Sequence, residues 1–183
     1  EYDLWRLRDD RCFDLEDLTD ILTPEQYLSH LRKHGADIIE HNPDIEQELE
    51  ELRAEHNAMQ EQVIDDVETH EIGEWTVALV YGNCPHNLTA EQIRNDNIAD
   101  VTAFVKPHGG LSFRGSENFE LCHKIAEQFG GGGHAKAAAG YPDTFDSMLD
   151  YAQHWTTHGE TVKQEVLAVF EDVYETSEYL ELI

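Results

Sequence analysis

The feature that most constrains this chain is a glycine run that ends in histidine: Gly130, Gly131, Gly132, Gly133 and His134. Residues 135–140 follow and are small apart from one lysine. Glycine has no Cβ, so such a loop adopts positive φ and lets backbone N–H groups approach an anion closely. A helix beginning in residues 135–140 would add its N-terminal donors and the positive end of its dipole. The run therefore predicts a loop that binds phosphate or a nucleotide, with a titratable histidine at its rim.

A structural explanation of the glycine run is the alternative. Gly130 follows an amphipathic segment, residues 118–129, and fits the left-handed position that ends many helices. The other glycines would then form a flexible turn. One cap needs one glycine, however, and each further glycine raises the entropy lost when the loop becomes ordered. We therefore favour a loop that contacts a ligand.

The chain is strongly acidic. Its 183 residues include 39 Asp and Glu against 12 Lys and Arg, a formal net charge of −27 at pH 7. This balance argues against a broad nucleic-acid-binding face, which needs a basic patch, but permits a small phosphorylated ligand held by a few donors. It suits a halophilic cytosol, where molar salt screens self-repulsion.

Cysteine usage and hydropathy indicate the compartment. Cys12, Cys84 and Cys122 are odd in number and far apart, which favours a reducing cytoplasm over a disulfide framework. No apolar stretch has the length of a membrane span, so we expect a cytoplasmic protein without a membrane partner.

The N-terminal part predicts helices. In residues 1–42, Thr23 and Gln26 form a capping box that opens a helix. Residues 43–70 predict a long polar helix whose thin apolar stripe has nearly heptad spacing. We interpret this helix as a connector between two lobes, and a coiled-coil homodimer is the alternative. Residues 159–183 predict an acidic helical tail.

Residues 71–158 predict a small domain of α/β class. Its fold would be a small mixed sheet flanked by helices and preceded by the long connector helix. Strands are expected at residues 75–81, 99–105 and 111–114, and helices at residues 118–129 and 143–154, with a short helix opening at residue 89. The helix at residue 89 would open with a second capping box, residues 89–92.

Arg114 is the basic residue best placed to serve the glycine run. It stands at the end of an expected strand, and a guanidinium there would bind phosphate bidentately. A surface ion pair amid the surplus carboxylates is the alternative. Lys124 and Lys136 would add positive potential, although each taken alone is typical of a solvated surface.

Together, Arg114 with residues 111–113, residues 125–129 and residues 130–140 resemble the C-terminal domain of DHH phosphoesterases. That domain carries a strand ending in Arg-Ser, a helix, and a GGGGH motif before a small-residue run. The resemblance covers about residues 74–158. It implies that Arg114, the glycines and His134 bind substrate phosphate. Gly115 follows Arg114 here, so the family's serine is not matched.

The resemblance also implies where catalysis would occur. The family's two divalent metal ions, Mn²⁺ or Mg²⁺, lie in an N-terminal domain, and no Asp-His-His occurs in this sequence. Residues 1–42 would be the end of that domain, and Asp3 a single surviving metal ligand. We expect no metal in this part of the protein and no catalytic residue.

The expected function is therefore substrate binding for an intact phosphodiesterase or exonuclease. Its substrate would be a phosphorylated nucleotide or a short single-stranded oligonucleotide. The alternatives are a non-catalytic nucleotide-binding or coiled-coil dimerisation module, and an accessory domain of the tRNA-editing type.

Overall fold

A computed structural model describes residues 11–35, 43–82, 84–106, 109–142 and 148–181. The chain divides into two compact units, Glu1–Met59 and Gln60–Ile183. No helix in the described ranges combines the length and the apolar character that a membrane crossing needs.

The first unit is helical. It holds α2 (Arg11–Ile21), α3 (Pro24–His34) and most of α4 (Pro43–Asp65). The predicted capping box of α3 is confirmed, because Thr23 Oγ1 accepts from Gln26 N and Gln26 Oε1 accepts from Thr23 N. Ile45 and Leu49 of α4 are buried with Leu18 of α2, so this part of the apolar stripe packs within the chain.

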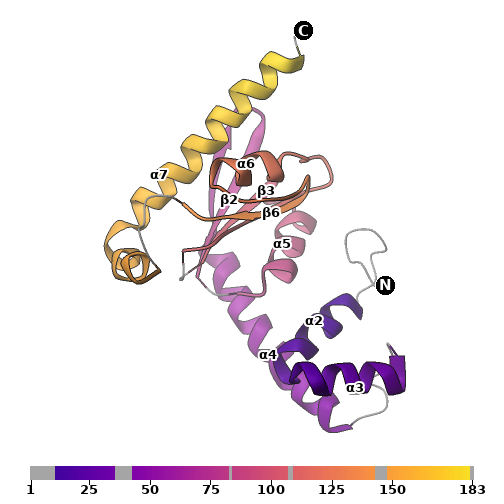
Figure 1. Cartoon of the computed structure of the whole chain (residues 1–183). Coiled ribbons are helices and arrows are strands. Elements are labelled where there is room, and N and C mark those ends of the chain that lie inside the picture. Colours follow the sequence, from indigo (N-terminus) through magenta and orange to yellow (C-terminus); the bar gives the residue numbers. More distant parts are fainter. Residues whose placement is uncertain (1–10, 36–42, 83, 107–108, 143–147, 182–183) are drawn as a thin grey trace. The chain divides into compact units, whose positions relative to one another are not determined.

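The second unit contains a six-stranded mixed sheet, which confirms the predicted α/β class (Figure 1). The strand order is β1-β2-β3-β4-β6-β5, in which β2 and β3 are parallel and every other pair is antiparallel. The strands are β1 (Glu68–Ile72), β2 (Trp75–Tyr81), β3 (Val101–Val105), β4 (Leu111–Gly115), β5 (Gly132–His134) and β6 (Ala137–Gly140). The helices are α5 (His86–Asn95), α6 (Cys122–Gln128) and α7 (Met148–Glu181).

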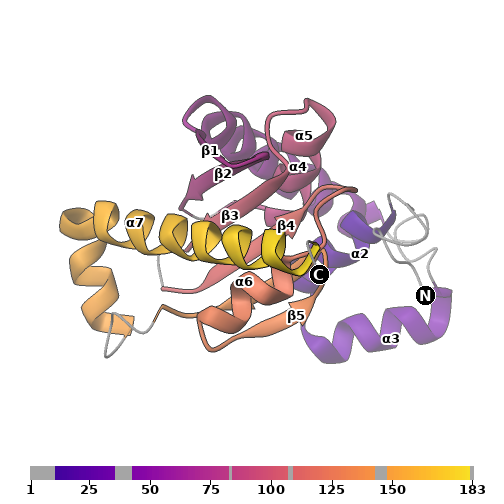
Figure 2. The same ribbon diagram turned by 90° about the horizontal axis from the view of Figure 1, so that it is seen from above.

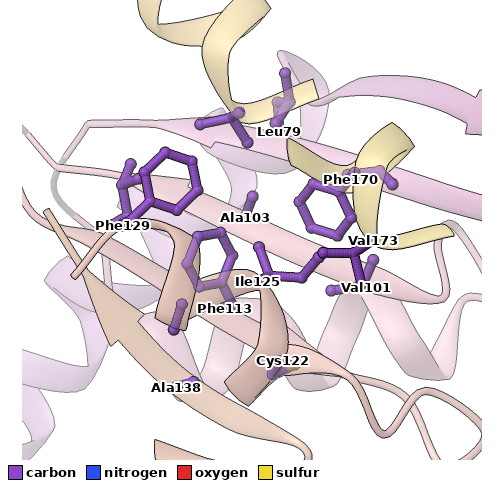
Figure 3. Close-up of a cluster of buried hydrophobic side chains, with 14 of the residues drawn as sticks. Leu79, Val101, Ala103, Phe113, Cys122, Ile125, Phe129, Ala138, Phe170 and Val173 are labelled. Atoms are coloured by element: carbon purple, nitrogen blue, oxygen red, sulfur yellow. The ribbon is translucent and has the colours of Figure 1, made fainter. Parts of the chain in front are cut away.

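Helices cover both faces of this sheet. Helices α6 and α7 lie side by side over one face, as Figure 2 shows, and their side chains form the larger core with the sheet. Phe113, Ile125 and Phe170 are fully buried there, between β4, α6 and α7 (Figure 3). On the opposite face, Ile93 of α5 packs with Phe104 of β3 in a smaller core. Successive side chains along each strand therefore point to opposite faces of the sheet and pack into two separate cores.

The expectation of a helix directly after the glycine run is wrong. Ala137–Gly140 is strand β6, which pairs antiparallel with β4 and β5. Alanine is the best helix former by intrinsic propensity, but pairing on both sides overrides that preference. Close packing also favours small residues here, since a Cβ on Gly140 would lie 2.7 Å from Phe129 Cβ.

Other element boundaries also differ from the expectations. The long helix expected over residues 43–70 ends at Asp65, and Glu68–Ile72 is strand β1. The polar sequence of β1 gives little strand signal, and pairing with β2 stabilises the strand. Helix α5 begins at His86, so Thr89 is a buried interior residue and caps nothing. The two helices expected after residue 142 belong to the single helix α7.

Candidate phosphate-binding site

The glycine run forms the end of α6 and the first strand of a hairpin. Gly130 has φ +63°, and Gly131 N donates to Ala126 O at 2.9 Å, which closes the last turn of α6. The chain then enters β5, the edge strand, and returns through β6. Gly130 is thus the left-handed helix cap that the alternative explanation described.

Two further glycines are required by close backbone approach. A Cβ on Gly131 would lie 1.9 Å from Ala139 O, and a Cβ on Gly133 would lie 2.6 Å from Ala137 O. Gly133 also has φ +149°. A Cβ on Gly132, in contrast, would meet no atom within 4 Å. Gly132 is therefore a glycine of this run with open space beside it.

The strand register places Arg114 and His134 on the same face of the sheet. Arg114 of β4 pairs with Ala137 of β6, and Ala137 pairs with His134 of β5. Residues paired across strands project from the same face, and neighbouring strands lie about 4.8 Å apart. The guanidinium and the imidazole are therefore carried two strands apart, about 10 Å between Cα atoms. In the strand register, Ala137 is the residue between Arg114 and His134.

The surface between Arg114 and His134 is low and open. The adjacent row of the same face holds Ser112, Ala139 and Gly132, which are paired in that order. Ala139, Gly132 and His134 are exposed to solvent, and α6 packs against the opposite face of these strands. The arrangement is a floor of small residues with a cation and an imidazole rising from it.

Hydrogen bonds to neighbouring described residues hold Arg114 in place. Its Nε donates to Asn87 Oδ1 at 3.0 Å, and its Nη1 donates to Ser112 Oγ at 2.8 Å and to Phe113 O at 3.0 Å. Asn87 lies in the first turn of α5, and Ser112 is buried two residues before Arg114 on the same strand face. The guanidinium is thus oriented before any ligand arrives, which lowers the entropy that binding must offset.

Lys106 adds a second cation to this face. It follows β3 two residues after Phe104, so strand alternation directs it to the Arg114 side. Burial lowers the pKa of the Lys106 ammonium, and the positive charge of Arg114 lowers that pKa further. No carboxylate within the described ranges forms an ion pair with Lys106. In so acidic a chain, two neighbouring cations here favour an anion as ligand.

Several residues singled out in the sequence do not join this face. Lys124 pairs with Glu127 at 3.2 Å, and Lys136 lies in the hairpin turn and donates to Glu117 O at 2.8 Å. Asp3 lies outside the described residues. The described part of the chain holds no group of three or more His, Cys, Asp or Glu that fits a metal ion.

The sequence reasoning missed Asn87, Ser112 and Lys106. For Ser112 a signal existed, because strand alternation puts residues i and i+2 on one face and Arg114 was already a candidate. No serine follows Arg114 directly, but Ser112, two residues before it, lies at hydrogen-bond distance from the guanidinium. Asn87 and Lys106 come from other elements, and only the pairing of β3 with β4 and the packing of α5 bring them near.

We predict that Arg114→Met raises the pKa of Lys106, because the substitution removes the positive charge that disfavours the ammonium. Adding inorganic phosphate to the wild-type protein raises the same pKa, since an anion favours the charged form. An NMR titration of the lysine side chains measures both effects. Arg94→Met is the matched control and leaves the Lys106 pKa unchanged. If the pKa of Lys106 changes neither in Arg114→Met nor on addition of phosphate, the placement of Lys106 beside Arg114 at an anion site is contradicted.

No protein-family model and no curated protein matches the chain. A pGpG-specific phosphodiesterase from Vibrio cholerae resembles its fold at 12% identity and TM-score 0.48, over 78% of this chain and 49% of that one. A DHH domain from a protein assigned to a family of ribosomal proteins resembles it at 14% identity and TM-score 0.47, over 79% and 34%. The C-Ala domain of Aquifex aeolicus alanyl-tRNA synthetase does so at 18% identity and TM-score 0.35, over 47% and 92%.

These similarities are similarities of fold. The chain spans less than half the length of the first two structures.

Proposed function

We propose that residues 71–158 bind the phosphate of a nucleotide or short oligonucleotide, as the substrate-binding domain of a DHH-type phosphoesterase. One observation carries this proposal: Arg114 and His134 rise from the same sheet face with only Ala137 between them. The charge of the whole chain makes the placement more specific, because most of its surface repels anions.

The chemistry of the face suits a phosphate group. A guanidinium offers a permanent positive charge and N–H donors to phosphate oxygens, and an imidazole offers one further N–H. Lys106 contributes positive potential from the neighbouring strand.

In the intact enzyme this domain would hold the substrate rather than cleave it. Two divalent metal ions bound by an N-terminal domain would supply the hydrolytic chemistry, and residues 1–42 would form the end of that domain. Helix α4 would connect the two parts. Arg114 and His134 would fix the phosphate position, which raises the rate of hydrolysis by orienting the ester.

Equilibrium dialysis of AMP against the wild-type chain tests the proposal. We expect binding, and we expect His134→Ala to lower the affinity about tenfold, since a hydrogen bond to a charged group contributes roughly 1.5–3 kcal/mol. His70→Ala is the matched control, because His70 lies on β1 at the opposite edge of the sheet. The proposal is rejected if the wild type binds no AMP, or if both variants bind as the wild type does.

Salt must be varied in the same experiment. At 0.15 M ionic strength the Debye length is about 8 Å, and at 1 M it is about 3 Å. Raising KCl screens the repulsion between AMP and the acidic surface, while the close contacts to Arg114 and His134 are screened less. Measuring at both salt concentrations therefore separates a weak site from long-range exclusion of the ligand.

A further inference from the structure

Tyr141 is an exposed aromatic side chain directly after β6. The residue is 60% exposed. Among the described residues, the other large hydrophobic residue that is exposed is Leu28, in the other unit. None of the described aromatic rings packs against Tyr141. The exposed ring of Tyr141 therefore has a face on which a flat ligand group can stack.

The strand pattern relates Tyr141 to the phosphate-binding face. Ala137 and Ala139 belong to that face, and alternation continued by one step assigns Tyr141 to it as well. The pairing of Leu111 with Gly140, continued in the same way, puts Gly110 opposite Tyr141.

Gly110 relates Tyr141 to Lys106 across the sheet. Lys106 N donates to Gly110 O at 2.9 Å, so Gly110, which is itself buried, lies between Lys106 and Tyr141. From Tyr141 to Ala137 the chain advances four residues, about 13 Å at the usual strand rise. The face thus extends well beyond the size of a free phosphate.

We propose that Tyr141 stacks against the base of the bound nucleotide, whose phosphate lies between Arg114 and His134. The inference rests on the proposed function and deepens it, because the nucleotide would be recognised at its base as well as at its phosphate. Ala137 and Ala139 form the floor under the sugar, where any larger side chain would obstruct it. Aromatic stacking accepts every base, so this contact selects nucleotides over other phosphate esters without selecting a sequence.

The test compares two ligands that share a phosphate. AMP carries a base, and ribose 5-phosphate does not. We expect the wild type to bind AMP roughly five- to a hundredfold more tightly, because stacking of one base contributes about 1–3 kcal/mol. Tyr141→Ala should remove this difference and leave the affinity for ribose 5-phosphate unchanged. Tyr141→Phe should keep it, and Tyr141→Leu should lose most of it.

Leu28→Ala is the matched control, since it removes the other exposed apolar side chain from a different unit. Equal binding of AMP and ribose 5-phosphate by the wild type overturns the stacking role while leaving the phosphate site standing. A Tyr141→Ala variant that loses affinity for both ligands equally also overturns it. If the wild type binds neither ligand, the proposed function fails and the stacking role falls with it.

Discussion

Arg114→Met is expected to lower the affinity for AMP by roughly ten- to a hundredfold. The guanidinium is a permanently charged donor on this face, and charged hydrogen bonds contribute roughly 1.5–3 kcal/mol. Methionine keeps the apolar stem of the side chain and removes its charge and donors. Equilibrium dialysis, or calorimetry where the affinity allows, measures the loss.

Two further variants separate the roles of Arg114. Arg114→Lys keeps the charge but loses the forked geometry, so it should recover only part of the affinity. Arg94→Met is the matched control, because Arg94 is a part-buried arginine that pairs with Glu91 at 2.8 Å. Unchanged AMP binding in Arg114→Met would show that the phosphate lies elsewhere.

Arg114 also contributes to the stability of the fold, so the free energy of unfolding must be measured together with AMP binding. The buried Ser112 hydroxyl accepts from Arg114, and the Asn87 amide oxygen does too. Arg114→Met leaves both acceptors without this donor, at a cost of about 1–3 kcal/mol in the free energy of unfolding. Urea unfolding of the same variant shows whether the AMP data come from a folded protein.

Gly131→Ala is expected to lower the free energy of unfolding by about 3 kcal/mol or more. The new Cβ would lie 1.9 Å from Ala139 O and 2.5 Å from Gly140 Cα, and both are backbone atoms of β6. A flexible side chain could move aside, but a paired strand cannot without breaking its hydrogen bonds. Urea unfolding measures the effect, and the hairpin should lose protection from amide hydrogen exchange first.

Gly132→Ala is the matched comparison, one residue along the same run. Its Cβ would meet no atom within 4 Å, so the free energy of unfolding should change by less than about 1 kcal/mol. Gly132 pairs with Ala139 on the Arg114 face, and the added methyl would therefore enter the proposed site. We expect a stable protein with weakened AMP binding. Equal stability of the two variants would contradict the hairpin geometry.

The fold class could be predicted because its signals are local. The strand at residues 75–81 is rich in β-branched and aromatic residues, and the turn residues before 111–114 predict a hairpin. The capping box at Thr23 is complete within four residues. Strand β1 could not be predicted in the same way, because its charged sequence becomes a strand only through pairing with β2.

The candidate site likewise combines features that local sequence predicts with features that depend on long-range contacts. The sequence by itself singled out Arg114, the glycine run and His134, since their chemistry and order in the chain suffice to nominate a phosphate site. Tertiary structure changed what the glycines do. Gly131 and Gly133 allow two backbones to approach closely, and the segment expected to begin a helix is strand β6.

Only the tertiary structure decided which residues share a face. Pairing of β4, β6 and β5 sets Arg114 beside His134, and the neighbouring elements bring Asn87 and Lys106 to the same side. A shift of one residue in that register would send Arg114 into the opposite core, because strand side chains alternate with a period of two. Local sequence specifies the side chains, whereas long-range hydrogen bonding between strands specifies the register that makes them a site.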